Sequence, residues 1–201
     1  MGLPYSLLLI TQPASEPVSV TEAKAHLVVE HSTDDTMIGV LITAARKHVE
    51  ARTNRALVRQ KWRIYLDEFS DCIDLHKQPV ISVDSVNYTD ADGVSQVVGG
   101  STSPVSPGSY YTLDTANGYV RKAYGATWPS PRNEANSVWV DFWSGYANTA
   151  ASPVTTVPAD LKIAILLMVE HMYEHRGHSS EIQLFTNPAF DLLIQPYWMP
   201  V

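Results

Sequence analysis

The spacing of apolar residues changes twice along this chain of 201 residues. Between about residues 34 and 54, apolar side chains recur at steps of three and four, which predicts a helix with one buried face. From 56 to 147, short runs alternate apolar and polar residues between turn sequences, which predicts antiparallel strands. Helical spacing returns at 158–176, with apolar residues on nearly every side. We therefore predict an α+β fold, a small bundle of about four helices interrupted by a β-rich insertion of short antiparallel strands.

These changes of period divide the chain into parts. We expect an extended N-terminal arm over 1–19 and a β-rich insertion over 56–147. The helical bundle combines 20–55 with 158–195, and a C-terminal tail covers 196–201.

Turn sequences fix two hairpins within the insertion. Asn117-Gly118 is typical of a tight two-residue hairpin turn. The acids of TDADG, 89–93, also resemble the start of a calcium-binding loop, but Gly100 stands where such a loop needs a glutamate. We therefore predict a hairpin turn there. Cys72 lies in a strand-like stretch, and we expect it to be packed instead of nucleophilic.

Composition argues against several classes of function. The net charge is −7 and the basic residues form no long run, so no positive patch for gripping nucleic-acid phosphates is evident. No stretch approaches the roughly 18 apolar residues of a membrane-spanning helix, and the start lacks the basic region of a secretory signal. One cysteine allows neither an intrachain disulfide nor a four-cysteine metal site. We expect synthesis in a reducing cytoplasm and no membrane association.

The sequence EHMYEH, 170–175, suggests a zinc enzyme. His171, Glu174 and His175 fit the H-x-x-E-H pattern, in which two imidazoles hold zinc and a glutamate activates water. A catalytic zinc needs a third protein ligand, and the sequence after His175 offers none that is well placed. Histidines in a last helical turn also interact favourably with the helix dipole. We predict no enzyme activity, cofactor or metal site, with His171 and His175 as the remaining candidate metal ligands.

Five phrases follow one another in a single order along most of the chain. They are LLITQPASEPVSVTEAKAHLVVEHSTDD, MIGVLITAARKHVEARTNRALVRQKWRIYLDEF, PVISVDSVNYTDADG, YGATWPSPRNEANSVWVDFWSGYA and VPADLKIAILLMVEHMYEHRG. Their wording and order resemble phage head–tail connector proteins, also called adaptors, of long-tailed double-stranded DNA phages. The resemblance implies a structural virion protein at the head–tail neck, made in the host bacterial cytoplasm. It implies a homo-oligomeric ring, typically of twelve subunits, beneath the portal protein. Such a ring extends the DNA channel and docks a stopper or tail-completion protein.

Two contact regions follow from this expected role. Tyr197, Trp198 and Met199 lie in the tail and are residue types enriched at interface cores, so we expect them to dock on the portal. The alternative is that the tail packs on its own bundle. Apolar and small residues of the two long helices are expected to pack subunits together: Leu41, Ala44, Ala45, Ile163 and Leu167. DNA would pass through the channel without specific binding, because the negative protein repels it at short range.

Two other functions remain open. One is a zinc-dependent hydrolase built on His171, Glu174 and His175. The other is a binding module whose β-rich insertion recognises a ligand on the host surface.

Overall fold

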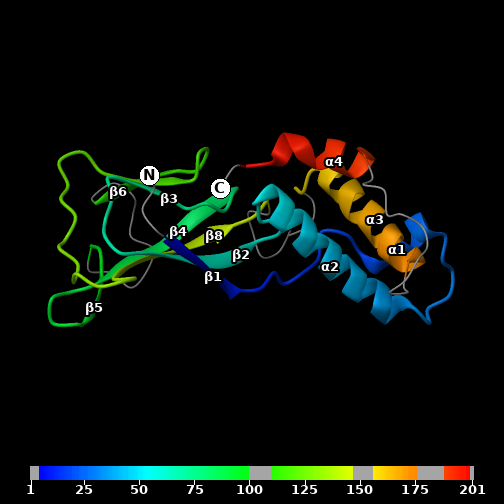
Figure 1. The fold of residues 1–201 in the computed structure, drawn as a ribbon, viewed down its shortest axis with the longest axis horizontal. Coiled ribbons are helices and arrows are strands. Elements are labelled where there is room, and N and C mark those ends of the chain that lie inside the picture. Colours follow the sequence, from blue (N-terminus) through cyan, green and yellow to red (C-terminus); the bar gives the residue numbers. More distant parts are fainter. Residues whose placement is uncertain (1–4, 100–109, 147–155, 176–187, 200–201) are drawn as a thin grey trace.

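The computed structural model describes residues 5–99, 110–146, 156–175 and 188–199 (Figure 1). Strands lie at one end of the molecule and helices at the other, which confirms the predicted α+β class. Among the described residues, no helix is long and apolar enough to span a bilayer. The elements are β1 (Tyr5–Thr11), α1 (Val20–Leu27), α2 (Asp35–Thr53), β2 (Gln60–Leu66), β3 (Cys72–Asp74), β4 (Val80–Thr89), β5 (Ser95–Val97), β6 (Tyr111–Asp114), β7 (Tyr119–Lys122), β8 (Val138–Ser144), α3 (Ala159–Glu174), α4 (Pro188–Ile194) and a 3-10 turn, η1 (Gln195–Tyr197).

Two antiparallel sheets form the β half. The larger has the strand order β1-β2-β8-β4-β5, and the smaller has the order β3-β7-β6. Alternation along the strands turns one face of each sheet inward, because successive side chains point to opposite sides. The facing residues form the β core: Ile64, Leu66, Ile73, Leu75, Val80, Val83, Val86, Val98, Tyr111, Val120, Val138, Val140 and Phe142.

The helices enclose a second cluster, the helical core. Helix α2 packs along α3, and α4 lies across α3 (Figure 1). The apolar period of α2 buries Ile38, Ile42 and Val49, whose neighbours include Leu161 and Ile165 of α3. Burying such a side chain contributes about 1.5–3 kcal/mol. Most of the stability of these helices therefore comes from this packing.

Both predicted hairpins are present. Strands β6 and β7 pair across residues 115–118, a connection that contains Asn117-Gly118 but has four residues instead of two, and β4 pairs with β5 across the TDADG turn. The Asp90 carboxylate accepts hydrogen bonds from the side chain of Gln96 and from the backbone N–H groups of Val94 and Asp92, and these bonds lower its pKa. These bonds stabilise the turn itself.

Residues 5–11 of the predicted N-terminal arm are extended and form the edge strand β1, which pairs with β2. One feature of the β half differs from expectation. Cys72 is exposed, so the prediction that it is packed is wrong. The three-residue strand β3 turns Ile73 into the core, and alternation therefore points Cys72 outward.

At the end of β8, the backbone at Gly145 passes very close to the backbone of Val58 and Arg59. Gly145 has a φ of 138°, and a Cβ there would lie 2.6 Å from backbone atoms of Val58 and Arg59. Only glycine fits that approach. Its N–H donates to Pro79 O at 2.9 Å, which fixes the end of β8 beside the start of β4.

Candidate interaction surfaces

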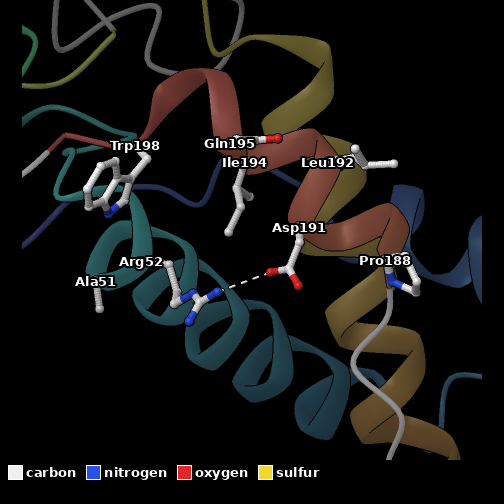
Figure 2. A pocket seen from close by; sticks show the side chains of 8 residues that line it. All are labelled: Ala51, Arg52, Pro188, Asp191, Leu192, Ile194, Gln195 and Trp198. Carbon is white, nitrogen blue, oxygen red and sulfur yellow. Dashed lines mark hydrogen bonds and ion pairs between the residues drawn. The ribbon is translucent and has the colours of Figure 1, made fainter.

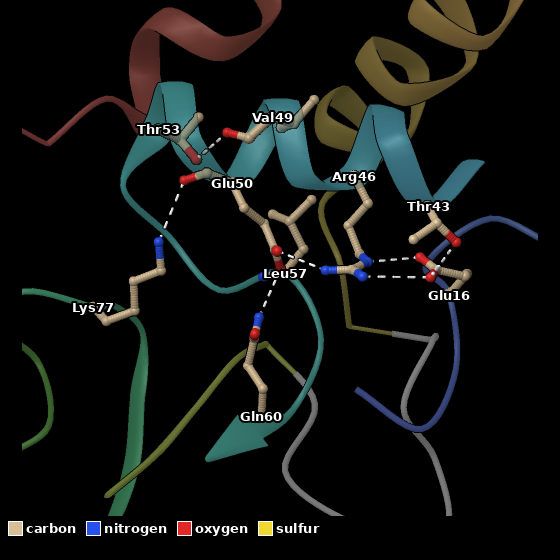
Figure 3. A network of polar contacts seen from close by, with 9 residues as sticks. All are labelled: Glu16, Thr43, Arg46, Val49, Glu50, Thr53, Leu57, Gln60 and Lys77. Atoms are coloured by element: carbon tan, nitrogen blue, oxygen red, sulfur yellow. Dashed lines mark hydrogen bonds and ion pairs between the residues drawn. The ribbon is translucent and has the colours of Figure 1, made fainter. Parts of the chain in front are cut away.

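A buried polar network lies where the two cores meet (Figure 3). Arg46 of α2 is 3% exposed and donates through Nε to Glu16 Oε2 and through Nη1 to Glu50 Oε2, each at 2.7 Å. The other oxygen of Glu50, Oε1, accepts from Leu57 N at 2.9 Å and from Gln60 Nε2 at 2.7 Å. We call these five residues the junction network. They connect the segment before α1, the middle of α2 and the start of β2.

Lys77 adds a buried ammonium beside this network. Its Nζ lies 3.5 Å from the backbone carbonyl oxygen of Glu50 and 5.1 Å from the ring centroid of Trp62. Burial lowers the pKa of Lys77, and the charge of Glu50 opposes that shift. Removing one partner of a buried charge pair is strongly destabilising, so we expect the fold to be sensitive to the loss of Arg46 or Glu50.

A groove of about 920 Å³ opens between the end of α2 and α4; we call it the C-terminal groove (Figure 2). Leu192 and Trp198 are its most exposed apolar side chains, at 69% and 63%. An ion pair from Arg52 Nη2 to Asp191 Oδ1, 3.0 Å long, connects the two helices. The lining residues are Ala51, Arg52, Pro188, Asp191, Leu192, Ile194, Gln195 and Trp198.

The tail residues predicted to dock on the portal differ in their surroundings. Tyr197 contacts its own chain: its carbonyl oxygen accepts from Arg55 Nε at 2.8 Å, and its hydroxyl donates to Asp160 at 3.1 Å. Partial burial and that hydrogen bond raise the pKa of Tyr197. Met199 is half-buried and its N–H donates to the carbonyl of Thr53 at 3.3 Å. Of these three residues, Trp198 is the one exposed to solvent. Tyr197 and Met199 therefore pack on their own chain, as the alternative expects for the tail.

The residues predicted to pack subunits together differ in their exposure to solvent. Ala44 is exposed and helps to line a shallow hollow of about 470 Å³ on α2, and Ile163 of α3 is 45% exposed. Leu41 and Leu167 are half-buried. Ala45 is fully buried in the helical core of its own chain, beyond the reach of a neighbour.

The two histidines considered as candidate metal ligands lie side by side at the end of α3. The ring centroids of His171 and His175 are 4.8 Å apart, and His175 Nδ1 lies 3.0 Å from the carbonyl oxygen of His171. Glu174 is exposed. Within the described ranges, no group of three or more His, Cys, Asp or Glu side chains is arranged to hold a metal ion.

Sequence reasoning did not predict the contacts on the outer face of the larger sheet, the face turned away from the β core. Arg63 of β2 makes two hydrogen bonds to Asp141 of β8, at 2.6 and 2.9 Å, and these bonds raise its pKa. The guanidinium of Arg59 lies 3.6 Å from the ring centroid of Trp143. The signal was present: basic residues alternate through RQKWR, and Trp139 and Trp143 alternate along β8.

Comparisons with known proteins agree with this architecture. Residues 17–95 match a family described as phage gp6-like head–tail connector proteins. The whole fold is similar to a chain from the neck of an empty gene transfer agent (GTA) particle computed with C6 symmetry, with 23% identity, coverage of 98% of this chain and 96% of that one, and a TM-score of 0.74. A chain from the virion of a native GTA particle gives 24% identity, 97% and 96% coverage, and a TM-score of 0.72. A chain from the neck of a native GTA particle computed with C12 symmetry has 25% identity, coverage of 98% of this chain and 96% of that one, and a TM-score of 0.70.

No curated protein sequence matches the chain. The resemblance to phage head–tail connectors expected from the sequence is nevertheless confirmed, by the family match over 17–95 and by these neck structures.

Proposed function

We propose that this protein is a structural head–tail connector of a phage-like particle, a ring subunit that sits beneath the portal and extends the DNA channel. The observation that carries the proposal is the connector-family match over 17–95, in a chain whose fold resembles a neck component with C12 symmetry over 98% of its length. The proposed ring contains twelve subunits and lies at the head–tail neck of the particle. Its role is structural and not enzymatic.

The exposed surfaces offer distinct places for the proposed contacts. We assign subunit packing to the exposed face of α2 at Ala44 and to Ile163 of α3, with the half-buried Leu41 and Leu167 beside them. A head-to-tail contact joins two different surfaces and closes a ring by rotation, which suits two separate helices. The net charge of −7 favours a channel through which DNA slides without being held.

We assign portal docking to Trp198 and the C-terminal groove. Trp198 is 63% exposed at the mouth of this groove, where an aromatic side chain can enter a pocket on a partner. The half-buried Tyr197 and Met199 hold the turn that presents it. The opposite side of the ring would dock the stopper or tail-completion protein.

The test is electron microscopy of the purified protein, alone and mixed with purified portal protein from the same particle. We expect rings, on the portal or free, with the symmetry of the neck. Particles that contain no copy of this chain at the neck would overturn the proposal. Stoichiometric zinc, together with a hydrolytic activity lost in a His171→Ala/His175→Ala variant, would favour the hydrolase instead.

A further inference from the structure

Strand β1 leaves one side of the larger sheet open. It pairs with β2 from Tyr5 to Thr11, and within the described part of the chain no strand lies on its other side. An edge strand of seven residues presents a row of unpaired N–H and C=O groups. Such an edge is a template for pairing with a further strand.

The side chains of β1 lack the features that usually protect an edge. Its sequence, YSLLLIT, contains no charged residue and no proline, although such residues commonly block edge pairing. Leu8, on the outer face, and Ile10, at the register shift, are 49% and 43% exposed, while Leu7 packs against the β core on the inner face. The only irregularity is a register shift between Leu9 and Thr11. The edge therefore carries two exposed aliphatic side chains, and no other strand of the described residues pairs with it.

The surface next to β1 is fixed and ready for contact. Leu8 lies opposite Arg63 in the register of β1 and β2. Asp141 holds the Arg63 guanidinium, which lies 5.8 Å from the ring centroids of Tyr65 and Trp139. A partner covering Leu8 would thus meet an ordered aromatic surface, with little side-chain entropy left to lose.

We propose that β1 takes up an extended segment of a second copy of this chain, adding a strand to the sheet at the contact between ring subunits. This inference rests on the proposed function, since a C12 neck supplies an identical neighbour to every subunit. In the described structure the two outermost strands of the sheet, β1 and β5, are different surfaces at opposite ends of the strand order. A head-to-tail contact requires different surfaces of this kind. Backbone pairing supplies the affinity, and burial of Leu8 and Ile10 supplies the apolar contact.

The test uses the full chain with Leu8 and Ile10 both changed to Lys, and a second variant with both changed to Thr, which keeps a strong preference for strands. The matched control is Val28→Lys, an aliphatic-to-lysine change at a residue that is 85% exposed after α1. Assembly on portal rings is followed by electron microscopy, and folding by circular dichroism. Amide hydrogen exchange of the peptide containing residues 5–11 reports the pairing directly.

We expect wild type and Val28→Lys to form rings in which residues 5–11 exchange much more slowly than in free subunits. Both β1 variants stay folded, and their self-association weakens by at least about tenfold. Rings of normal stability from both folded variants, or unchanged exchange at 5–11 in wild-type rings, would overturn the inference. So would slow exchange in single subunits bound to portal, which assigns the edge to the portal. A wild type that never forms rings refutes the proposed function itself, a result distinct from these.

Discussion

At the residue scale, Glu50 joins helix α2 to the segment that leads into β2. Its carboxylate accepts from a guanidinium, a backbone N–H and a side-chain amide, and it is itself 7% exposed. Replacing Glu50 with Gln removes the negative charge while keeping the shape, and leaves Arg46 with Glu16 as its remaining ionic partner. We expect a loss of about 3 kcal/mol in the free energy of unfolding, measured by urea denaturation.

The control for Glu50→Gln is Arg52→Gln, which breaks the ion pair with Asp191. Both partners of that pair are about half exposed, so its removal should cost under about 1 kcal/mol. Equal losses in the two variants would show that the junction network contributes no more than a surface pair.

Lys77 gives a prediction in alkaline solution. Burial lowers its pKa in the folded protein below the ordinary value of 10.5, so the unfolded chain binds more protons between the two values. Lys77 therefore adds stability as pH rises through that window. Three tyrosines with raised pKa values, Tyr111, Tyr146 and Tyr197, act in the opposite direction. The difference in stability between wild type and Lys77→Met cancels the tyrosine contributions and reports the contribution of Lys77 alone.

We expect the stability advantage of Lys77→Met over wild type to be largest near pH 7. The advantage should shrink as pH rises towards the ordinary lysine value, because wild-type Lys77 then folds without a charge. Urea denaturation of both proteins at several pH values measures this difference in the free energy of unfolding. A difference that stays constant with pH would show that Lys77 keeps its ordinary pKa in the folded state.

At the scale of elements, local period predicted most of the architecture. Helix α2, expected over about 34–54, spans Asp35–Thr53, and the helix expected over 158–176 is Ala159–Glu174. Residues three and four apart in the sequence decide such helices, so the signal is local. The place of β1 depends on pairing between Tyr5 and Leu66, far apart in the chain, and no local pattern encodes that partner. For the same reason the sequence predicted apolar contact residues but missed the junction network.

The tail gives a prediction for a single exposed side chain. Trp198→Ala should leave thermal stability unchanged, because the ring is 63% exposed and the anchoring bonds belong to Tyr197 and the Met199 backbone. Portal affinity should fall by about 2 kcal/mol or more, roughly thirtyfold, if Trp198 is a docking hot spot. Titration against purified portal rings measures it, with the exposed aromatic change Tyr124→Ala as control. Equal affinity for Trp198→Ala and wild type would remove Trp198 from the portal contact.

At the scale of the whole molecule, two cores joined by one buried network make an elongated subunit with separate exposed surfaces (Figure 1). The exposed α2 face lies on the helical end, and the β1 edge lies on the sheet end. If both join neighbouring copies, each ring contact has two parts connected through the junction network. Damage to either part should then weaken the ring while the subunit stays folded.

Ala44→Glu tests the helical part of that contact. Ala44 is exposed, so a glutamate there should leave the unfolding temperature of the free subunit within a few degrees of wild type. In the ring it would place a charge in a closely packed contact, and we expect few or no rings on portal by electron microscopy. The control is Ala25→Glu, at another exposed helical alanine on α1. Normal rings from Ala44→Glu, alongside loss of rings in the β1 variants, would confine the contact to the sheet. Normal rings from Ala44→Glu and from the β1 variants would show that other surfaces join the subunits.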